Sequence, residues 1–103
     1  MKASFERKRR PTHPGEALRE EFLPALGISK TELADRLGVS RQTVHELLTE
    51  NRGISADMAL RLAKFFNTSR EMWLGLQEDI DLWEAMKVNR KAYEKIEPAT
   101  ADK

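Results

Sequence analysis

The feature that most constrains the fold is a pair of serine-initiated amphipathic segments joined by a glycine and a valine. Ser29 and Ser40 each precede a run in which apolar residues recur three or four positions apart. A serine at such a place accepts a hydrogen bond from a backbone N–H of the first helical turn. Gly38 can adopt the left-handed conformation that ends the first run, and Val39 fills the corner. The pattern predicts two short helices that cross at a fixed angle.

The two faces of this helix pair differ in polarity. The inward residues are Leu33, Ala34, Leu37, Val44 and Leu47. The outward residues, near the start of the second helix, are Arg41, Gln42, Thr43, His45 and Glu46. A helix over residues 41–49 is about 13 Å long, and its N-terminal end fits a major groove about 12 Å wide. We therefore predict a helix-turn-helix in which residues 41–49 form the recognition helix.

Each outward side chain suits a particular contact with DNA. Arg41 can pair with guanine through two hydrogen bonds, and Gln42 with adenine. Thr43 suits a thymine methyl group or a phosphate, whereas Glu46 either accepts from cytosine or orients Arg41 or Arg52. Further contacts, mainly to the phosphate backbone, are expected from Lys30, Ser40, His45, Asn51 and Arg52. The alternative is a helical hairpin that only completes a bundle core.

Other helix signals give an all-α chain of five helices. A first helix over residues 16–23 is expected to end before Pro24. Ser55 caps a fourth helix that continues to about residue 66, and Ser69 begins a fifth. No stretch shows the alternation of a strand.

The fifth helix carries an apolar seam suited to pairing with another helix. Its residues are Trp73, Leu76, Ile80 and Trp83. One recognition helix covers only a few base pairs, so proteins of this architecture present two of them about 34 Å apart. We expect a homodimer through residues 73–86, with Trp83 as its anchor. In the alternative, Trp83 packs on the first helix of its own chain.

Charge divides the 103-residue chain unevenly, although its net charge is only +1. Residues 1–13 contain five basic residues and one acidic residue. We therefore expect a basic N-terminal arm (1–13), a helix-turn-helix domain (14–78), and a C-terminal helical extension and tail (79–103). The arm suits contact with phosphate or with an acidic partner, and the alternative is a frayed terminus.

Composition argues against several other classes of protein. No apolar run approaches the roughly 20 residues of a membrane span, and cysteine is absent. The two histidines, His13 and His45, lie on different predicted elements, and His13 is expected to cap the first helix. We expect a cytoplasmic protein with no membrane association, no metal, no cofactor and no enzymatic activity.

Five segments within residues 13–83 match the pattern of a known family. They are His13-Pro14-Gly15-Glu16, Leu18 to Phe22, Val39 to Val44, Arg52 to Ala63, and Trp73-Leu74 with Leu76-Gln77. In these segments the chain resembles the HigA antitoxins, a branch of the phage-repressor-like helix-turn-helix proteins. The resemblance implies a lambda-repressor-like domain with a C-terminal dimerisation helix.

The resemblance also implies two partners. One is double-stranded operator DNA, which a dimeric repressor of its own operon would bind. The other is a RelE-like, mRNA-cleaving toxin of a type II toxin-antitoxin system, which we expect to meet residues 1–23. Two alternatives are a stand-alone transcriptional regulator without a toxin, and a protein-interaction module that does not bind DNA.

Overall fold

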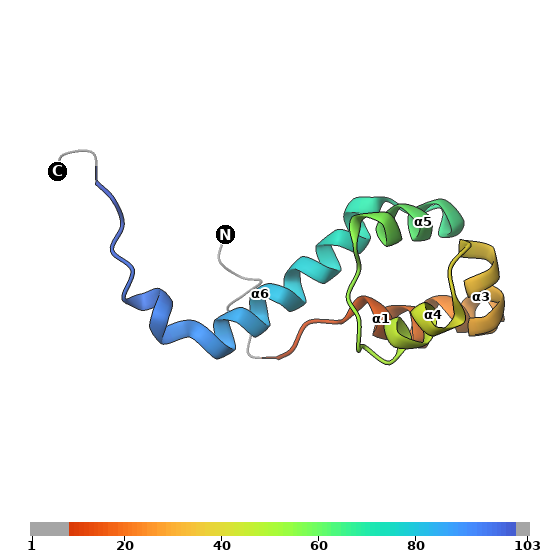
Figure 1. The fold of residues 1–103 in the computed structure, drawn as a ribbon, viewed down its shortest axis with the longest axis horizontal. Coiled ribbons are helices and arrows are strands. Elements are labelled where there is room, and N and C mark those ends of the chain that lie inside the picture. Colours follow the sequence, from red (N-terminus) through yellow and green to blue (C-terminus); the bar gives the residue numbers. More distant parts are fainter. Residues whose placement is uncertain (1–8, 101–103) are drawn as a thin grey trace.

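The computed structural model describes residues 9–100, and every regular element in that range is helical. The elements are α1 (Pro14–Ala17), the π-helical turn η2 (Leu18–Phe22), α2 (Leu23–Leu26), α3 (Lys30–Leu37), α4 (Arg41–Leu48), α5 (Ala56–Phe66) and α6 (Arg70–Glu94). The first three follow one another without a break, so this part of the chain has the five helices that the sequence predicted. Figure 1 shows the shorter helices gathered at one end of the molecule, with α6 extending away from them.

A serine begins each of the helices α3, α4, α5 and α6, as predicted. In each case the serine Oγ accepts a hydrogen bond of 3.0–3.1 Å from the backbone N–H three residues later. The serines are Ser29, Ser40, Ser55 and Ser69. These bonds satisfy N–H groups that have no partner within the helix, and they fix where each helix starts.

The first helix begins at a buried histidine. His13 is only 6% exposed, and its Nδ1 accepts a hydrogen bond from the Gly15 N–H at 2.9 Å. The predicted capping role of His13 is therefore confirmed. Burial lowers the pKa of His13 from its ordinary value, which favours the neutral imidazole that can accept at Nδ1.

This first helical run continues past Pro24, where the sequence predicted that it would end. The Leu23 N–H donates to the carbonyl of Leu18, five residues earlier, and so forms a π-helical turn. The wider turn lies directly before Pro24, whose ring would clash with a carbonyl in a regular α-helical turn. The run ends at Gly27, which adopts a φ of 67°. The predicted end at residue 23 was therefore wrong by three residues.

The helices share one apolar core, and the start of α6 belongs to it. The largest completely buried side chains are Trp73, Leu18, Leu33, Leu47, Leu62, Ile80 and Val44, together with Pro14. The Trp73 ring lies 4.9 Å from the Phe22 ring and 6.0 Å from the Phe66 ring, measured between centroids. Its Nε1 donates to the Thr68 hydroxyl at 2.8 Å. Trp73 thus joins α6 to the first helix and to the end of α5.

The first helix also crosses α4 at very short range. Gly15 lies directly against the backbone carbonyl of Leu47, and a Cβ added to Gly15 would overlap that oxygen. Arg19 in η2 fastens the same helix pair, because its Nη1 donates to the Leu48 carbonyl at 2.6 Å. The C-terminal end of α4 is therefore held by backbone contact and by a charged hydrogen bond.

The position of α6 corrects the predicted dimer seam. Trp73 and Ile80 are 0% and 1% exposed, and Leu76 packs against the core. Trp73 and Ile80 therefore have no surface left for a second chain, and their assignment to a dimer interface was wrong. Trp83 is half-buried, with the Lys87 Nζ 4.9 Å from the centroid of its ring. The spacing identified the inner face of α6, but neighbours in the same chain cover that face.

The helix boundaries can be compared with the predicted division into an arm, a domain and a C-terminal extension. The boundary expected between residues 78 and 79 falls inside α6, whose backbone leaves helical geometry only at Asn89 (φ −119°, ψ 19°). Of the basic residues expected in the arm, Arg9 and Arg10 are described, whereas Lys2, Arg7 and Lys8 lie outside the described residues. Within residues 9–100, no helix is both long enough and apolar enough to cross a membrane.

Replacing Gly15 with alanine is expected to lower the free energy of unfolding by about 3 kcal/mol or more, because a carbonyl in the middle of the core cannot move aside. Gly75 in α6 provides the control, since a Cβ added there meets no atom within 4 Å. Gly75→Ala is expected to raise stability by about 0.5–1 kcal/mol. Urea denaturation followed by circular dichroism measures both changes. A Gly15→Ala variant as stable as the parent would contradict the close crossing.

Candidate nucleic-acid interface

Helices α3 and α4 form the predicted helix-turn-helix. Gly38 lies between them with a φ of 73°, and the next N–H, that of Val39, donates to the Ala34 carbonyl at 3.1 Å. The inward residues predicted from the sequence are all buried; they are Leu33, Ala34, Leu37, Val44 and Leu47. The crossing of the two helices is thus fixed by a hydrogen-bonded turn and by a filled core.

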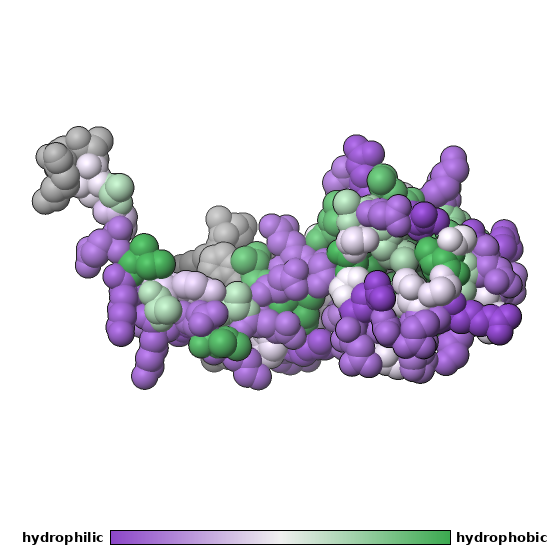
Figure 2. Space-filling model, in the orientation of Figure 1, coloured by the Kyte–Doolittle hydropathy of each residue, from purple (hydrophilic) through white to green (hydrophobic). Residues whose placement is uncertain are grey.

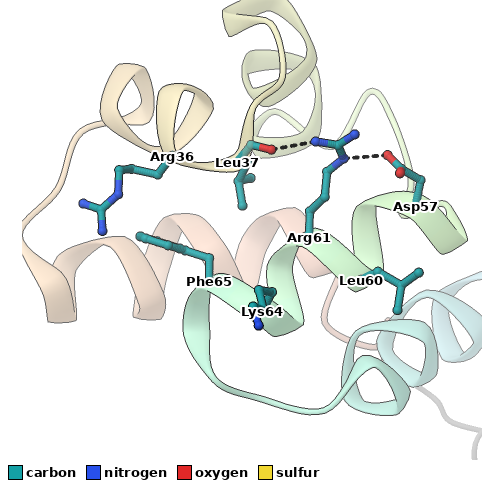
Figure 3. A pocket seen from close by; sticks show the side chains of 7 residues that line it. All are labelled: Arg36, Leu37, Asp57, Leu60, Arg61, Lys64 and Phe65. Atoms are coloured by element: carbon teal, nitrogen blue, oxygen red, sulfur yellow. Dashed lines mark hydrogen bonds and ion pairs between the residues drawn. The ribbon is translucent and has the colours of Figure 1, made fainter.

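Arg61 of α5 holds the same turn from outside. Figure 3 shows its guanidinium between two acceptors. Nη1 donates to the Leu37 carbonyl at 2.8 Å, and Nε donates to the Asp57 carboxylate at 2.8 Å. Sequence reasoning missed this role, because nothing in the local pattern connects Arg61 with a carbonyl 24 positions earlier.

The polar side chains predicted on the recognition helix share one accessible face of α4. Arg41, Gln42 and His45 are exposed, whereas Thr43 and Glu46 are half-exposed. Ser40, which caps the helix, also lies 2.8 Å from the Thr43 hydroxyl, oxygen to oxygen. This face therefore presents donors and acceptors at the N-terminal end of a helix whose other side is embedded in the core.

Glu46 is the centre of a hydrogen-bonded group on this face. Its Oε2 accepts from the Gln42 amide nitrogen at 2.9 Å, and its Oε1 accepts from Nε and Nη2 of Arg52 at 3.0 and 2.7 Å. Hydrogen bonds from Gln42 and then Arg52 hold the pKa of Glu46 below its ordinary value. Of the two arginines considered from the sequence as partners of Glu46, the structure pairs it with Arg52.

Two other predicted residues flank the face. Lys30, the first residue of α3, places its Nζ 3.3 Å from Nδ1 of His45 on α4. Asn51 follows α4, and its side-chain amide donates to the Thr49 hydroxyl at 3.1 Å. The structure thus brings Lys30, the α4 side chains, Asn51 and Arg52 to adjoining positions around one helix.

A second carboxylate supports the loop that holds Asn51 and Arg52. Glu50 adopts a φ of 65°, and it accepts from Arg10 at 3.0 Å and from Arg19 at 3.3 Å. Burial alone would raise the pKa of Glu50, but these two hydrogen bonds lower it below the ordinary value. Sequence reasoning missed Glu50 and Arg19, since their partners are distant in the chain.

The arrangement has the chemistry of nucleic-acid recognition. Cations and amides surround a helix that can enter a groove, and both carboxylates are occupied by arginines. Among residues 9–100, no group of three or more His, Asp or Glu side chains is placed to hold a metal ion. The fold and this face define a helix-turn-helix protein of the DNA-binding class.

Comparison with known proteins identifies a family profile and relatives that match this chain. The helix-turn-helix family profile matches residues 17–73. The chain is 46% identical over 76 residues to the uncharacterized HTH-type transcriptional regulator YbaQ of Escherichia coli K12, covering 74% of this chain and 67% of YbaQ. It is 42% identical over 78 residues to antitoxin HigA-1 of Vibrio cholerae, covering 75% and 72% of the two chains.

A solved structure also shows the similarity to HigA antitoxins. The Pseudomonas aeruginosa antitoxin HigA, solved with the higBA promoter, superposes with a TM-score of 0.83 at 48% identity. The match covers 88% of this chain and all of that chain. The chain belongs to the HigA-type family of helix-turn-helix antitoxins.

Proposed function

We propose that the chain represses its own operon by binding operator DNA, with α4 in the major groove. The observation that carries this proposal is the single accessible face on which Arg41 and Gln42 lie between Lys30 and Arg52. The relative from Pseudomonas aeruginosa was solved with its promoter, which supports the same ligand class for this chain. Binding to chromosomal DNA would place the protein in the cytoplasm.

Base contacts are assigned to the N-terminal end of α4. Arg41 is exposed and extends from the first turn of the helix, where it suits guanine. Gln42 suits adenine, and Thr43 suits a thymine methyl group or the adjacent phosphate. His45 lies further along the helix beside Lys30, so we place it at the edge of the groove.

Phosphate contacts are assigned to the flanks. Lys30 and Ser40 lie at the N-terminal ends of α3 and α4, where free N–H groups attract anions. Asn51 and Arg52 lie on the opposite flank, in the loop after α4. Contacts of this kind set the position of a protein on the duplex without reading its sequence.

The assignment predicts two kinds of variant. Arg41→Ala and Gln42→Ala should each weaken binding to the chain's own promoter by about 1–3 kcal/mol, with little change on random DNA. Lys30→Ala should weaken binding to the promoter and to random DNA alike. It should also reduce the slope of log K against log salt concentration by about one unit per protomer. Lys64→Ala removes an exposed cation of α5, away from this face, and serves as the control. Fluorescence anisotropy at several salt concentrations measures these effects. Promoter binding that Arg41→Ala and Gln42→Ala leave unchanged would contradict the assignment.

We also propose a RelE-like toxin as the protein partner. The support is membership of the HigA-type family and the similarity to antitoxin HigA-1. The first helix and the arm, residues 1–23, are the proposed contact. Arg10 and Arg19 of this segment lie beside Glu50, on the side of α4 away from its N-terminal end. YbaQ is named a transcriptional regulator, which favours a regulator without a toxin as the second candidate.

The toxin proposal predicts that the small protein encoded beside this chain inhibits growth and that co-expression of the chain restores it. Removal of residues 1–12 should weaken binding of that protein in calorimetry. The double variant Arg41→Ala, Gln42→Ala should bind the neighbouring protein as tightly as the parent does, because the proposed contact with that protein does not include α4. A neighbour that neither inhibits growth nor binds the chain would favour the stand-alone regulator.

The proposed homodimer pairs the outer face of α6 with its copy. Leu74, Leu82 and Val88 are exposed on this helix. Residues 70–84 contain five acidic residues and one basic residue, whereas residues 85–95 contain four basic residues and one acidic residue. Two copies of α6 that run antiparallel would therefore place the basic segment of each helix beside the acidic segment of the other. Trp83, half-buried, would lie at the edge of this contact.

Charge exchange tests the antiparallel pairing. Glu78→Lys or Lys91→Glu alone should weaken dimerisation about tenfold, because each two-fold dimer then contains two like-charge contacts. The double variant Glu78→Lys, Lys91→Glu restores opposite charges and should dimerise as well as the parent. Sedimentation equilibrium measures the three constants. A double variant as weak as the worse single variant would rule out this pairing.

A further inference from the structure

We propose that Glu46 is a positioning residue that makes Gln42 select adenine and reject guanine. The inference rests on the proposed function, because it concerns the base that Gln42 meets in the operator. Glu46 would act without touching that base. Its role is to decide which way round the Gln42 amide faces.

The orientation of the amide follows from the hydrogen bond between Gln42 and Glu46. An ionised carboxylate can only accept, so the group that Gln42 turns towards it must be the NH2 and not the carbonyl. The observed distance of 2.9 Å joins the Gln42 nitrogen to Oε2 of Glu46. One amide hydrogen is thereby committed to Glu46. The other hydrogen and the carbonyl oxygen remain for a ligand.

Arg52 keeps the Glu46 carboxylate ionised and fixed in position. It donates twice to Oε1, which leaves Oε2 for Gln42 and anchors Glu46 from the opposite side. The ion pair also offsets a negative charge that would otherwise repel the phosphates of a bound duplex. Glu46 is therefore held on two sides, by two hydrogen bonds to Oε1 and one to Oε2.

The remaining groups of Gln42 match one purine and not the other. Adenine presents an acceptor at N7 beside a donor at N6, and one N–H with one carbonyl oxygen satisfies both. Guanine presents acceptors at N7 and O6. Against guanine, the fixed amide would place its carbonyl oxygen opposite O6, and turning the amide over would break the bond to Glu46. A freely rotating glutamine amide would discriminate less.

Selection from a randomised duplex library tests the inference, with enriched sequences read for the parent, Glu46→Gln and Glu46→Ala. The parent should prefer adenine over guanine at one position of each half-site by about 5- to 150-fold, the range of a good bidentate contact. In both variants the preference should fall below about threefold. Glutamine at position 46 can donate as well as accept, so it cannot impose the orientation. Glu32→Gln is the control, because Glu32 also accepts from an arginine, Arg36, but is not the partner of Gln42.

A coupling measurement separates positioning from direct contact. In Gln42→Ala the adenine preference should be absent, and adding Glu46→Gln should change nothing further. If Glu46→Gln retains the full adenine preference, or alters a different base position when Gln42 is absent, the inference is wrong. Thermal unfolding confirms that each variant is folded. A parent chain that enriches no sequence would instead contradict the proposed function itself.

Discussion

The position of α4 depends on a contact in which no side chain intervenes. Gly15 lies against the Leu47 carbonyl, and Arg19 donates to the next carbonyl along the helix. A recognition helix has to hold its polar face at a fixed angle, because a small rotation moves every side chain relative to the bases. The first helix supplies that constraint at the C-terminal end of α4. The turn at Gly38, held by Arg61, supplies it at the N-terminal end. The recognition helix is thus fixed at both ends before DNA arrives.

Two carboxylates also hold exposed side chains in position at the surface. Glu46 joins Gln42 to Arg52, and Glu50 joins Arg10 to Arg19. Exposed ion pairs contribute little to stability, so their value here lies in geometry. Long side chains that are already positioned lose less conformational entropy on binding than freely rotating ones. Several polar side chains around α4 are therefore already held in position, although most of them are exposed.

Features that depend only on residues close in the chain could be predicted from the sequence. Serine caps, a left-handed glycine and the inward leucines of α3 and α4 have causes within one or two turns, and all were found. The predicted seam on α6 failed because periodicity identifies a buried face without saying what buries it; the cover of Trp73 and Ile80 comes from the same chain. Pro24 was misjudged because a π-helical turn accommodates it. Arg61 and Glu50 were missed, since long-range pairs leave no local signal. The predicted DNA contacts cluster on one face, and their bonding to DNA stays a prediction.

We propose that α4 reads the major groove and that a dimer presents two copies of it. Methylation protection on the chain's own promoter measures this directly, because dimethyl sulfate modifies guanine N7 in the major groove and adenine N3 in the minor groove. Two clusters of protected guanine N7 atoms are expected, about 10 base pairs apart and related by a two-fold axis. Protection confined to adenine N3, or a single cluster, would contradict it.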